Sequence, residues 1–150
     1  MAVDVSTEIV IEVPVADVAR YAENPDHAPE WYENIKSIEW QSAPPLARGS
    51  RIAFVAHFLG KRLAYTYEVT VYEPGECLVM RTAQGPFPME TTYSWIPKGP
   101  NSTLMKLRNR GEPRGFSRVM APFMARAMRR ANEKDLRRLK ALLEQSASDQ

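Results

Sequence analysis

Aromatic, methionine and hydroxyl side chains recur at alternate positions of several extended segments, and they are the main candidates for chemistry in this sequence. A buried tyrosine hydroxyl needs a hydrogen-bond partner, and a dry core supplies few of them. An apolar cavity with a few placed hydroxyls would let water or a ligand pair with them. We therefore expect a ligand cavity, with a solid core as the alternative. The candidate ligand-binding residues are Trp31, Phe54, Phe58, Tyr65, Tyr67, Met80, Met89, Thr91, Tyr93, Trp95, Met105, Phe116, Met120, Phe123 and Met124.

The other reactive side chains do not group into a recognisable catalytic site. His27 and His57 have no nearby partner for a triad or a metal site, and Cys77 has no visible base. Strand alternation places Arg81 and Arg108 on the outer face, in solvent or surface salt bridges. No His, Asp or Glu is predicted inside the cavity. Catalytic residues therefore stay unassigned, and we expect neither a metal site nor a cofactor.

Known sequence motifs exclude several large enzyme classes. The chain contains no G-x-G-x-x-G, P-loop, H-E-x-x-H or G-x-S-x-G motif. Hydride transfer, phosphoryl transfer, zinc-peptidase and serine-hydrolase chemistry each lack their usual residues. Whether the protein is an enzyme is left open at this point.

Length and composition predict one soluble domain spanning residues 1–150. The single cysteine cannot form an internal disulfide, which fits a reducing cytoplasm. No apolar run approaches the roughly 20 residues that cross a bilayer, and no signal peptide is visible, so we expect a cytoplasmic protein and no integral membrane segment. Residues 1–97 carry 7 Lys/Arg and 13 Asp/Glu, whereas residues 98–150 carry 13 and 5. The basic excess therefore lies mostly near the C-terminus.

The order of predicted elements is a strand, two helices, a run of strands and one long helix. Residues 3–13 alternate as a strand, and residues 15–24 and 26–35 read as two helices, the second capped by Asp26. Trp31 and Tyr32 in this corner are interpreted either as core residues or as a cavity gate. The remaining strands are predicted at residues 37–41, 51–59, 62–72, 77–83, 87–96 and 102–110.

The pairing of one predicted hairpin indicates which side of the sheet is buried. A turn at Gly60–Lys61 sets Leu59 opposite Arg62, Phe58 opposite Leu63 and Phe54 opposite Tyr67. Every apolar or aromatic pair then lies on one side of the sheet. A curved antiparallel sheet with an aromatic inner face needs an element to cover it, and only the C-terminal helix is long enough.

That helix is predicted over residues 114–145, with a bend at Pro122. Its front half is rich in Met and Phe and is expected to line the cavity, because Met adapts to variable partners. Its Leu-rich rear half is expected to pack a fixed core on a different face. Five cations on its polar side read as a solvated surface, and no aromatic residue accompanies them, so we expect no nucleic-acid binding. These cations are Arg126, Arg129, Arg130, Arg137 and Lys140.

Several phrases of the chain resemble the START-like, Bet v 1-like (SRPBCC) superfamily, in its bacterial polyketide cyclase/dehydrase and lipid-transport branch. They are NPDHAPEWYENI, GSRIAFVAHFLGKRLAYTYEV, EPGECLVMRTAQGPFPMETTYSW, LRNRGEPRGF and KDLRRLKALLE. The resemblance implies an α+β helix-grip fold of about seven strands, with a cavity between the curved sheet and the long helix. It carries over no catalytic residue, because one scaffold in this superfamily hosts binders, carriers and enzymes.

The sequence therefore predicts binding of an apolar or aromatic small molecule, lipid or polyketide-like, as the first hypothesis. A cofactor-independent cyclase/dehydratase is the alternative, with tyrosine hydroxyls polarising a substrate carbonyl. A buried acid, or a His, beside a tyrosine would favour the enzyme. An interaction module that uses the basic helix is a third reading, and a homodimer is left open.

Overall fold

Seven antiparallel strands form one continuous sheet in the computed structural model, which describes residues 2–113 and 120–149. The strand order across the sheet is β1-β7-β6-β5-β4-β3-β2, so every neighbouring pair but one is also consecutive in the chain. The elements in chain order are β1 (Val3–Ile11), α1 (Val15–Glu23), η1 (Pro25–His27), α2 (Ala28–Trp31), β2 (Ile35–Trp40), β3 (Arg51–Phe58), β4 (Lys61–Glu73), β5 (Cys77–Gln84), β6 (Met89–Gly99), β7 (Ser102–Gly111) and α3 (Ala121–Ser148). The predicted α+β helix-grip fold is confirmed.

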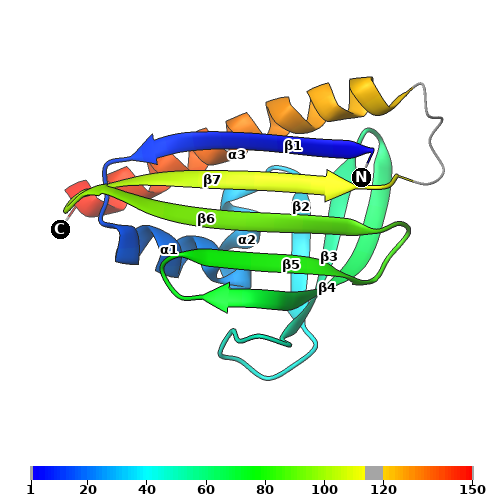
Figure 1. Ribbon diagram of the computed structural model, residues 1–150, viewed down its shortest axis with the longest axis horizontal. Coiled ribbons are helices and arrows are strands. Elements are labelled where there is room, and N and C mark those ends of the chain that lie inside the picture. The colour runs from blue at the N-terminus through cyan, green and yellow to red at the C-terminus, as the bar shows by residue number, and fades with distance from the viewer. Residues whose placement is uncertain (1, 114–119, 150) are drawn as a thin grey trace.

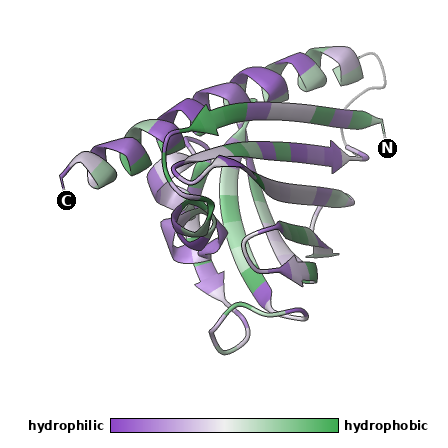
Figure 2. Cartoon of the chain, turned by 60° about the vertical axis from the view of Figure 1, so that its left-hand side comes forward, coloured by the Kyte–Doolittle hydropathy of each residue, from purple (hydrophilic) through white to green (hydrophobic). Residues whose placement is uncertain are grey.

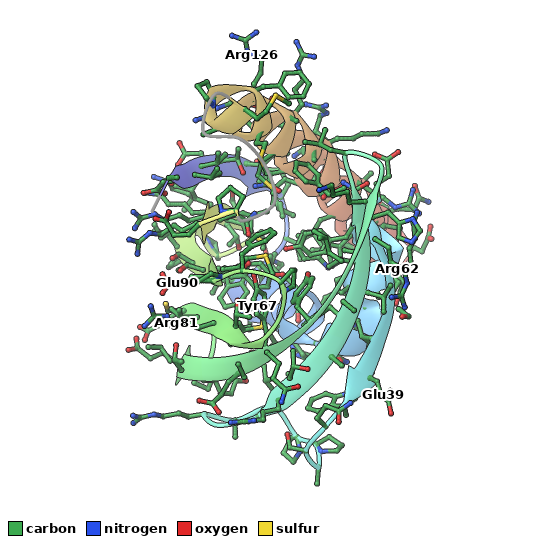
Figure 3. All side chains as sticks on the ribbon, turned by 90° about the vertical axis from the view of Figure 1, so that its right-hand side faces the viewer. Glu39, Arg62, Tyr67, Arg81, Glu90 and Arg126 are labelled. Atoms are coloured by element: carbon green, nitrogen blue, oxygen red, sulfur yellow. The ribbon has the colours of Figure 1, made fainter. Side chains whose placement is uncertain are left out.

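The sheet curves into a half-barrel, and α3 runs along its β1 side (Figure 1). In the end-on view of Figure 3, Tyr67 lies inside the curve, while Arg62, Arg81 and Glu39 lie on its outer surface. The short helices α1 and α2 follow β1; α1 packs on β6 and β7, and α2 packs on β2 and α3. The chain thus closes one end of the half-barrel with helices.

The rear of α3 fixes the helix to the sheet. Leu136, Leu139 and Leu143 are buried in the main core cluster with Ile11, Trp31 and other side chains of the concave face. Figure 2 shows hydrophilic residues recurring along α3 between more apolar ones, as an amphipathic helix requires. The predicted role of these leucines as a fixed core is confirmed.

Two cations of α3 bind the edge of the sheet while remaining accessible to solvent. Arg129 donates from Nη1 to the Ser6 carbonyl at 2.9 Å, and Lys140 donates from Nζ to the Val10 carbonyl at 2.8 Å. Both carbonyls belong to β1, an edge strand whose outer backbone groups have no partner strand. Occupied carbonyls make an edge less available to another chain. The expectation of a purely solvated face is therefore wrong for these two side chains.

The hairpin between β3 and β4 has the predicted face but a different register. Phe54 pairs with Tyr65, Ala56 with Leu63 and Phe58 with Lys61, two residues away from the predicted alignment. The turn is Leu59–Gly60, with φ angles of 51° and 76°, and not Gly60–Lys61. A two-residue hairpin turn with positive φ at both central positions matches the twist of the strands. A slip of two residues keeps every side chain on its face, so hydrophobic pairing alone could not detect it.

Pro122 does not bend α3. The helix begins at Ala121, and Pro122 stands in its first turn, where the missing N–H leaves no hydrogen bond unmade. The predicted change of buried face at this proline is therefore wrong. The predicted helical residues 114–119 lie outside the described part of the chain.

The cap of the second helical segment also differs from the prediction. Asn24, not Asp26, is the capping residue: its Oδ1 accepts from the Asp26 N–H at 3.0 Å. The Asp26 carboxylate instead accepts from Trp40 Nε1 at 2.9 Å. Asn24 precedes Pro25, which starts the 3₁₀ turn, so the capping group stands two residues earlier than expected.

Candidate functional site

A cavity of about 130 Å³ lies between the concave face of the sheet and α3. The sheet supplies most of its wall, from β3 to β7, and α3 closes the opposite side. Most of the wall is apolar or aromatic. The α3 residues that line it are Met124, Met128, Ala131, Asn132 and Asp135.

Many of the candidate ligand-binding residues line this cavity. They are Phe54, Phe58, Tyr65, Tyr67, Met80, Met89, Thr91, Tyr93 and Met124. Trp31, Trp95 and Met105 are buried in the core and do not line it. Met120 and Phe123 are 39% and 54% exposed and also lie outside its wall. Phe116 lies outside the described residues.

Three aromatic rings form one continuous section of the wall. Phe54 stacks on Tyr65 with ring centroids 5.4 Å apart, and Tyr67 meets both rings edge-on. These residues are neighbours across the β3–β4 hairpin, where alternate positions face the cavity. The wall can therefore offer ring edges and faces to an aromatic ligand.

Two of the three inward tyrosines have partners within the protein. The Tyr67 hydroxyl lies 2.9 Å from Thr91 Oγ1, which donates to Asn109 Oδ1 at 2.7 Å. The Tyr93 hydroxyl lies 2.6 Å from that of Tyr32. Burial raises the pKa of Tyr67 to about 12 and raises the pKa of Tyr93 and Tyr32 as well. All three phenols therefore stay protonated at neutral pH.

Tyr65 differs from the other cavity tyrosines. Its hydroxyl makes no hydrogen bond to any residue that the structure describes, and burial raises its pKa well above the usual value. Of the three inward tyrosines, only Tyr65 therefore has a hydroxyl left to pair with a ligand or water oxygen.

Trp31 and Tyr32 have separate places in the helical corner. The Trp31 ring is fully buried, 4.1 Å from the Tyr32 ring and 5.8 Å from the Tyr93 ring. Tyr32 lines the cavity. Trp31 therefore supports the aromatic pair from behind, as a core residue, and Tyr32 presents its hydroxyl to the site.

Sequence reasoning missed two polar residues of the wall, Asn132 and Asp135. Both are only 2% exposed. The Asp135 carboxylate accepts the Glu33 N–H at 3.1 Å. Burial raises the Asp135 pKa to about 6, although the hydrogen bond from the Glu33 N–H lowers it; the Glu33 carboxylate adds a smaller rise, while Lys134 and Arg138 oppose it. The expectation that no carboxylate faces the cavity is therefore wrong.

A signal for these two residues is present in the sequence. The buried positions of α3 are Met124, Asn132, Asp135, Leu136, Leu139 and Leu143, which form one stripe at helical spacing. Grouping Met120 and Phe123 with the apolar stripe shifted its front half to a side that is in fact exposed. Once those two residues are removed, Asn132 and Asp135 fill the gap between the methionines and the leucines.

The other candidate reactive groups lie away from the cavity. Arg81 pairs with Glu90 at 3.0 Å, and Arg108 binds both carboxylate oxygens of Asp4, so both arginines are on the outer face as predicted. His57 is exposed. Burial raises the pKa of the Cys77 thiol, which disfavours the nucleophilic thiolate.

Neither a metal-binding cluster nor a membrane-spanning helix occurs among the residues that the structure describes. No group of three or more His, Cys, Asp or Glu side chains there could hold a metal ion. Among the same residues, no helix has the length and apolar character needed to cross a bilayer.

Comparison with solved structures shows a shared fold at low sequence identity. The protein TTHA0849 from Thermus thermophilus is 20% identical, with a TM-score of 0.81 over 95% of this chain and 98% of that one. A START superfamily protein from Mycobacterium smegmatis is 19% identical, with a TM-score of 0.81 over 95% and 97%. The Zhui aromatase/cyclase from a Streptomyces species is 12% identical, with a TM-score of 0.79 over 96% and 94%.

The family of the chain follows from its sequence match. Comparison of the chain with curated proteins found no match. The family model described as polyketide cyclase / dehydrase and lipid transport matches residues 2–144, nearly the whole chain. The chain therefore belongs to the polyketide cyclase / dehydrase and lipid transport family, within the START-like (SRPBCC) superfamily.

Proposed function

We propose that this protein binds an apolar or aromatic small molecule in the cavity between its sheet and α3. The observation that carries the proposal is the cavity itself. Its wall is mostly aromatic and Met-rich, with polar groups at a few positions, which is the usual composition of a small-molecule site. A solid core would have filled this space, because protein interiors pack to nearly crystalline density.

A cofactor-independent cyclase or dehydratase is the second candidate, and Asp135 favours it. A carboxyl with a pKa of about 6 holds and releases protons near neutral pH, as general acid–base catalysis requires. The Tyr32–Tyr93 hydroxyl pair lines the same cavity and could polarise a substrate carbonyl. Within the described residues, however, Asp135 accepts its hydrogen bond from the Glu33 backbone rather than from a tyrosine.

Cellular location and assembly complete the proposal. We place the protein in the cytoplasm, where its half-buried Cys77 thiol would stay reduced. The ligand is its expected partner, and we propose no nucleic-acid binding. A homodimer stays a prediction, and it would need a surface other than the β1 edge that Arg129 and Lys140 cover.

Native mass spectrometry tests the binding function directly. The purified protein is mixed with fatty acids, sterols, aromatic polyketides and single-ring aromatics, and bound masses are recorded. Ala131→Leu places a larger side chain in the cavity wall, and Ala141→Leu makes the same change at an exposed position of α3. We expect Ala131→Leu to lose binding at least about tenfold and Ala141→Leu to match the parent protein.

Two results would count against the proposal. If no compound binds the parent protein, the cavity has no ligand-binding function in this panel. If Ala131→Leu binds as well as the parent, the ligand sits elsewhere. A change in the mass of the released compound, lost in Asp135→Asn, would favour the enzyme over the binder.

A further inference from the structure

The size of the cavity limits its occupant. A cavity of about 150 Å³ lined by Leu, Ile and Phe holds one benzene ring, whereas pockets for drug-sized ligands run from about 300 to 1,000 Å³. The cavity here has about 130 Å³. Its conformation in this structure therefore fits a single ring, not a sterol, a long acyl chain or a multi-ring polyketide.

Asn132 is a buried polar residue of the wall that lacks a partner among the described residues. It is 2% exposed, and neither atom of its amide makes a hydrogen bond to a residue in the described part of the chain. Buried side-chain amides in proteins are nearly always paired, because an unpaired one is destabilising. Its presence on the buried stripe of α3 therefore calls for a partner that is not part of the described protein.

Asp135 supplies a complementary group one turn further along α3. Residues three positions apart lie on the same face of a helix. One Asp135 oxygen accepts the Glu33 N–H, and the other makes no hydrogen bond within residues 2–113 and 120–149. Together Asn132 and Asp135 offer one amide donor and one carboxylate acceptor to the same small space.

We infer that the cavity takes a single-ring aromatic ligand with one hydroxyl, a phenol, whose oxygen accepts from Asn132 and whose O–H donates to Asp135. This inference rests on the proposed binding function and specifies its ligand class. A hydroxyl is the smallest group that donates one hydrogen bond and accepts another at a single atom. The stacked rings of Phe54 and Tyr65, with Tyr67 edge-on, provide the wall for the ligand ring.

Other ring compounds match the site less well. A hydrocarbon such as toluene fits the apolar wall but leaves Asn132 and Asp135 unpaired. A carboxylate ligand would add its negative charge to those of Asp135 and nearby Glu33, and like charges repel. Lys134 and Arg138 also act on Asp135, but Lys134 pairs with Glu33 and Arg138 with the Glu30 carbonyl, both in exposed positions.

Titration calorimetry with three matched ligands tests the inference. They are p-cresol, toluene and p-toluate, which share a methyl-substituted ring and differ in the second substituent. At pH 7.5 we expect p-cresol to bind at least about tenfold more tightly than toluene, since a site built for a hydroxyl rejects the analogue without it. We expect p-toluate to bind most weakly.

A variant ties the preference to its residue. Asn132→Leu is similar in size and removes the unpaired amide, so it should fold at least as well as the parent. We expect it to prefer p-cresol over toluene less strongly than the parent does, because only the hydrogen bond to Asp135 remains. Glu133→Gln, on the exposed side of the same helix, should keep the full preference. In the parent protein, p-cresol should also shift the side-chain amide NMR signal of Asn132.

Each other outcome overturns a defined part of the reasoning. Equal binding of p-cresol and toluene by the parent protein, or an undiminished preference in Asn132→Leu, overturns the phenol inference. Binding of larger ligands without binding of p-cresol overturns it too, while the proposed function stands. If neither this trio nor the mass-spectrometry panel binds, both fail.

Discussion

Replacing Asp135 by Asn should make the protein more stable at neutral pH, although it removes a buried, hydrogen-bonded carboxylate. Asn keeps a side-chain oxygen that can accept the Glu33 N–H, so the contact at 3.1 Å is retained. What the substitution removes is the cost of ionising a carboxyl that is only 2% exposed.

The magnitude follows from the pKa of this carboxyl. Burial raises the pKa from 3.8 to about 6, against the opposing effects of the Glu33 N–H hydrogen bond, Lys134 and Arg138. One pKa unit corresponds to about 1.4 kcal/mol, so ionised Asp135 lowers the free energy of unfolding by about 3 kcal/mol.

The direction of the Asp135 pKa shift sets the pH range over which this residue changes the stability. Because the folded pKa lies above the unfolded value, the folded state binds the proton more tightly. The contribution of Asp135 to stability is therefore fully present below about pH 4 and is lost as pH rises through about 6. The advantage of Asp135→Asn over the parent should grow by about 3 kcal/mol between pH 4 and pH 7.5 and then stay constant.

Urea denaturation of both proteins at pH 4, 5, 6 and 7.5 measures this difference. Glu133→Gln, which removes a carboxylate from the exposed side of α3, controls for the loss of one negative charge. A stability difference between parent and Asp135→Asn that does not change over this range would refute the buried, ionised carboxyl in the cavity wall. NMR titration of the Asp135 carboxyl carbon gives an independent measure of its pKa.

Four further substitutions test three separate parts of the structure. Tyr67→Phe breaks the hydrogen-bonded set of Tyr67, Thr91 and Asn109 and should lower the free energy of unfolding by about 1–2 kcal/mol. Tyr65→Phe loses no hydrogen bond within the described residues and should change the free energy of unfolding by less than about 0.5 kcal/mol. Equal losses for the two variants in urea denaturation would contradict this. Leu59→Asn should raise the melting temperature, with a gain of about 0.5–1 kcal/mol, because Asn tolerates a φ of 51° better than Leu; a lower melting temperature would argue against this turn. Leu139→Ala should cost about 2–5 kcal/mol, since Leu139 is fully buried, and a cost below about 1 kcal/mol would show that the rear of α3 is not fixed to the core.

The strands and their faces could be predicted because alternation has a period of two, and side chains with that period keep their face when the register is wrong by two residues. The β3–β4 hairpin shows the limit. Its predicted register is wrong by two residues, yet Phe54, Tyr65 and Tyr67 still face the cavity. Only the turn could have fixed the register, and Leu59 at positive φ is a residue that turn statistics disfavour there.

The polar part of the cavity could not be predicted in the same way. Periodicity identifies the buried side of a helix from its apolar residues. A polar residue on that side is therefore taken to mark the edge of the buried stripe. Periodicity therefore does not identify Asn132 and Asp135, and it includes exposed Met120 and Phe123 because of their residue type alone. The hydrogen bond from the Glu33 N–H to Asp135 joins residues 102 positions apart, and no local pattern encodes such a contact.

The division of α3 therefore lies near Leu136 rather than at Pro122. From Met124 to Asp135 its inner side lines the cavity, and from Leu136 to Leu143 it packs against the core of the sheet. Because the two segments belong to one unbroken helix, the packed rear positions the cavity-lining front. Substitutions at Leu136, Leu139 or Leu143 should then change stability first, and ligand binding only through it. Substitutions at Ala131 or Asn132 should change binding while the fold remains, and this separation distinguishes a binding site from an imperfectly packed core.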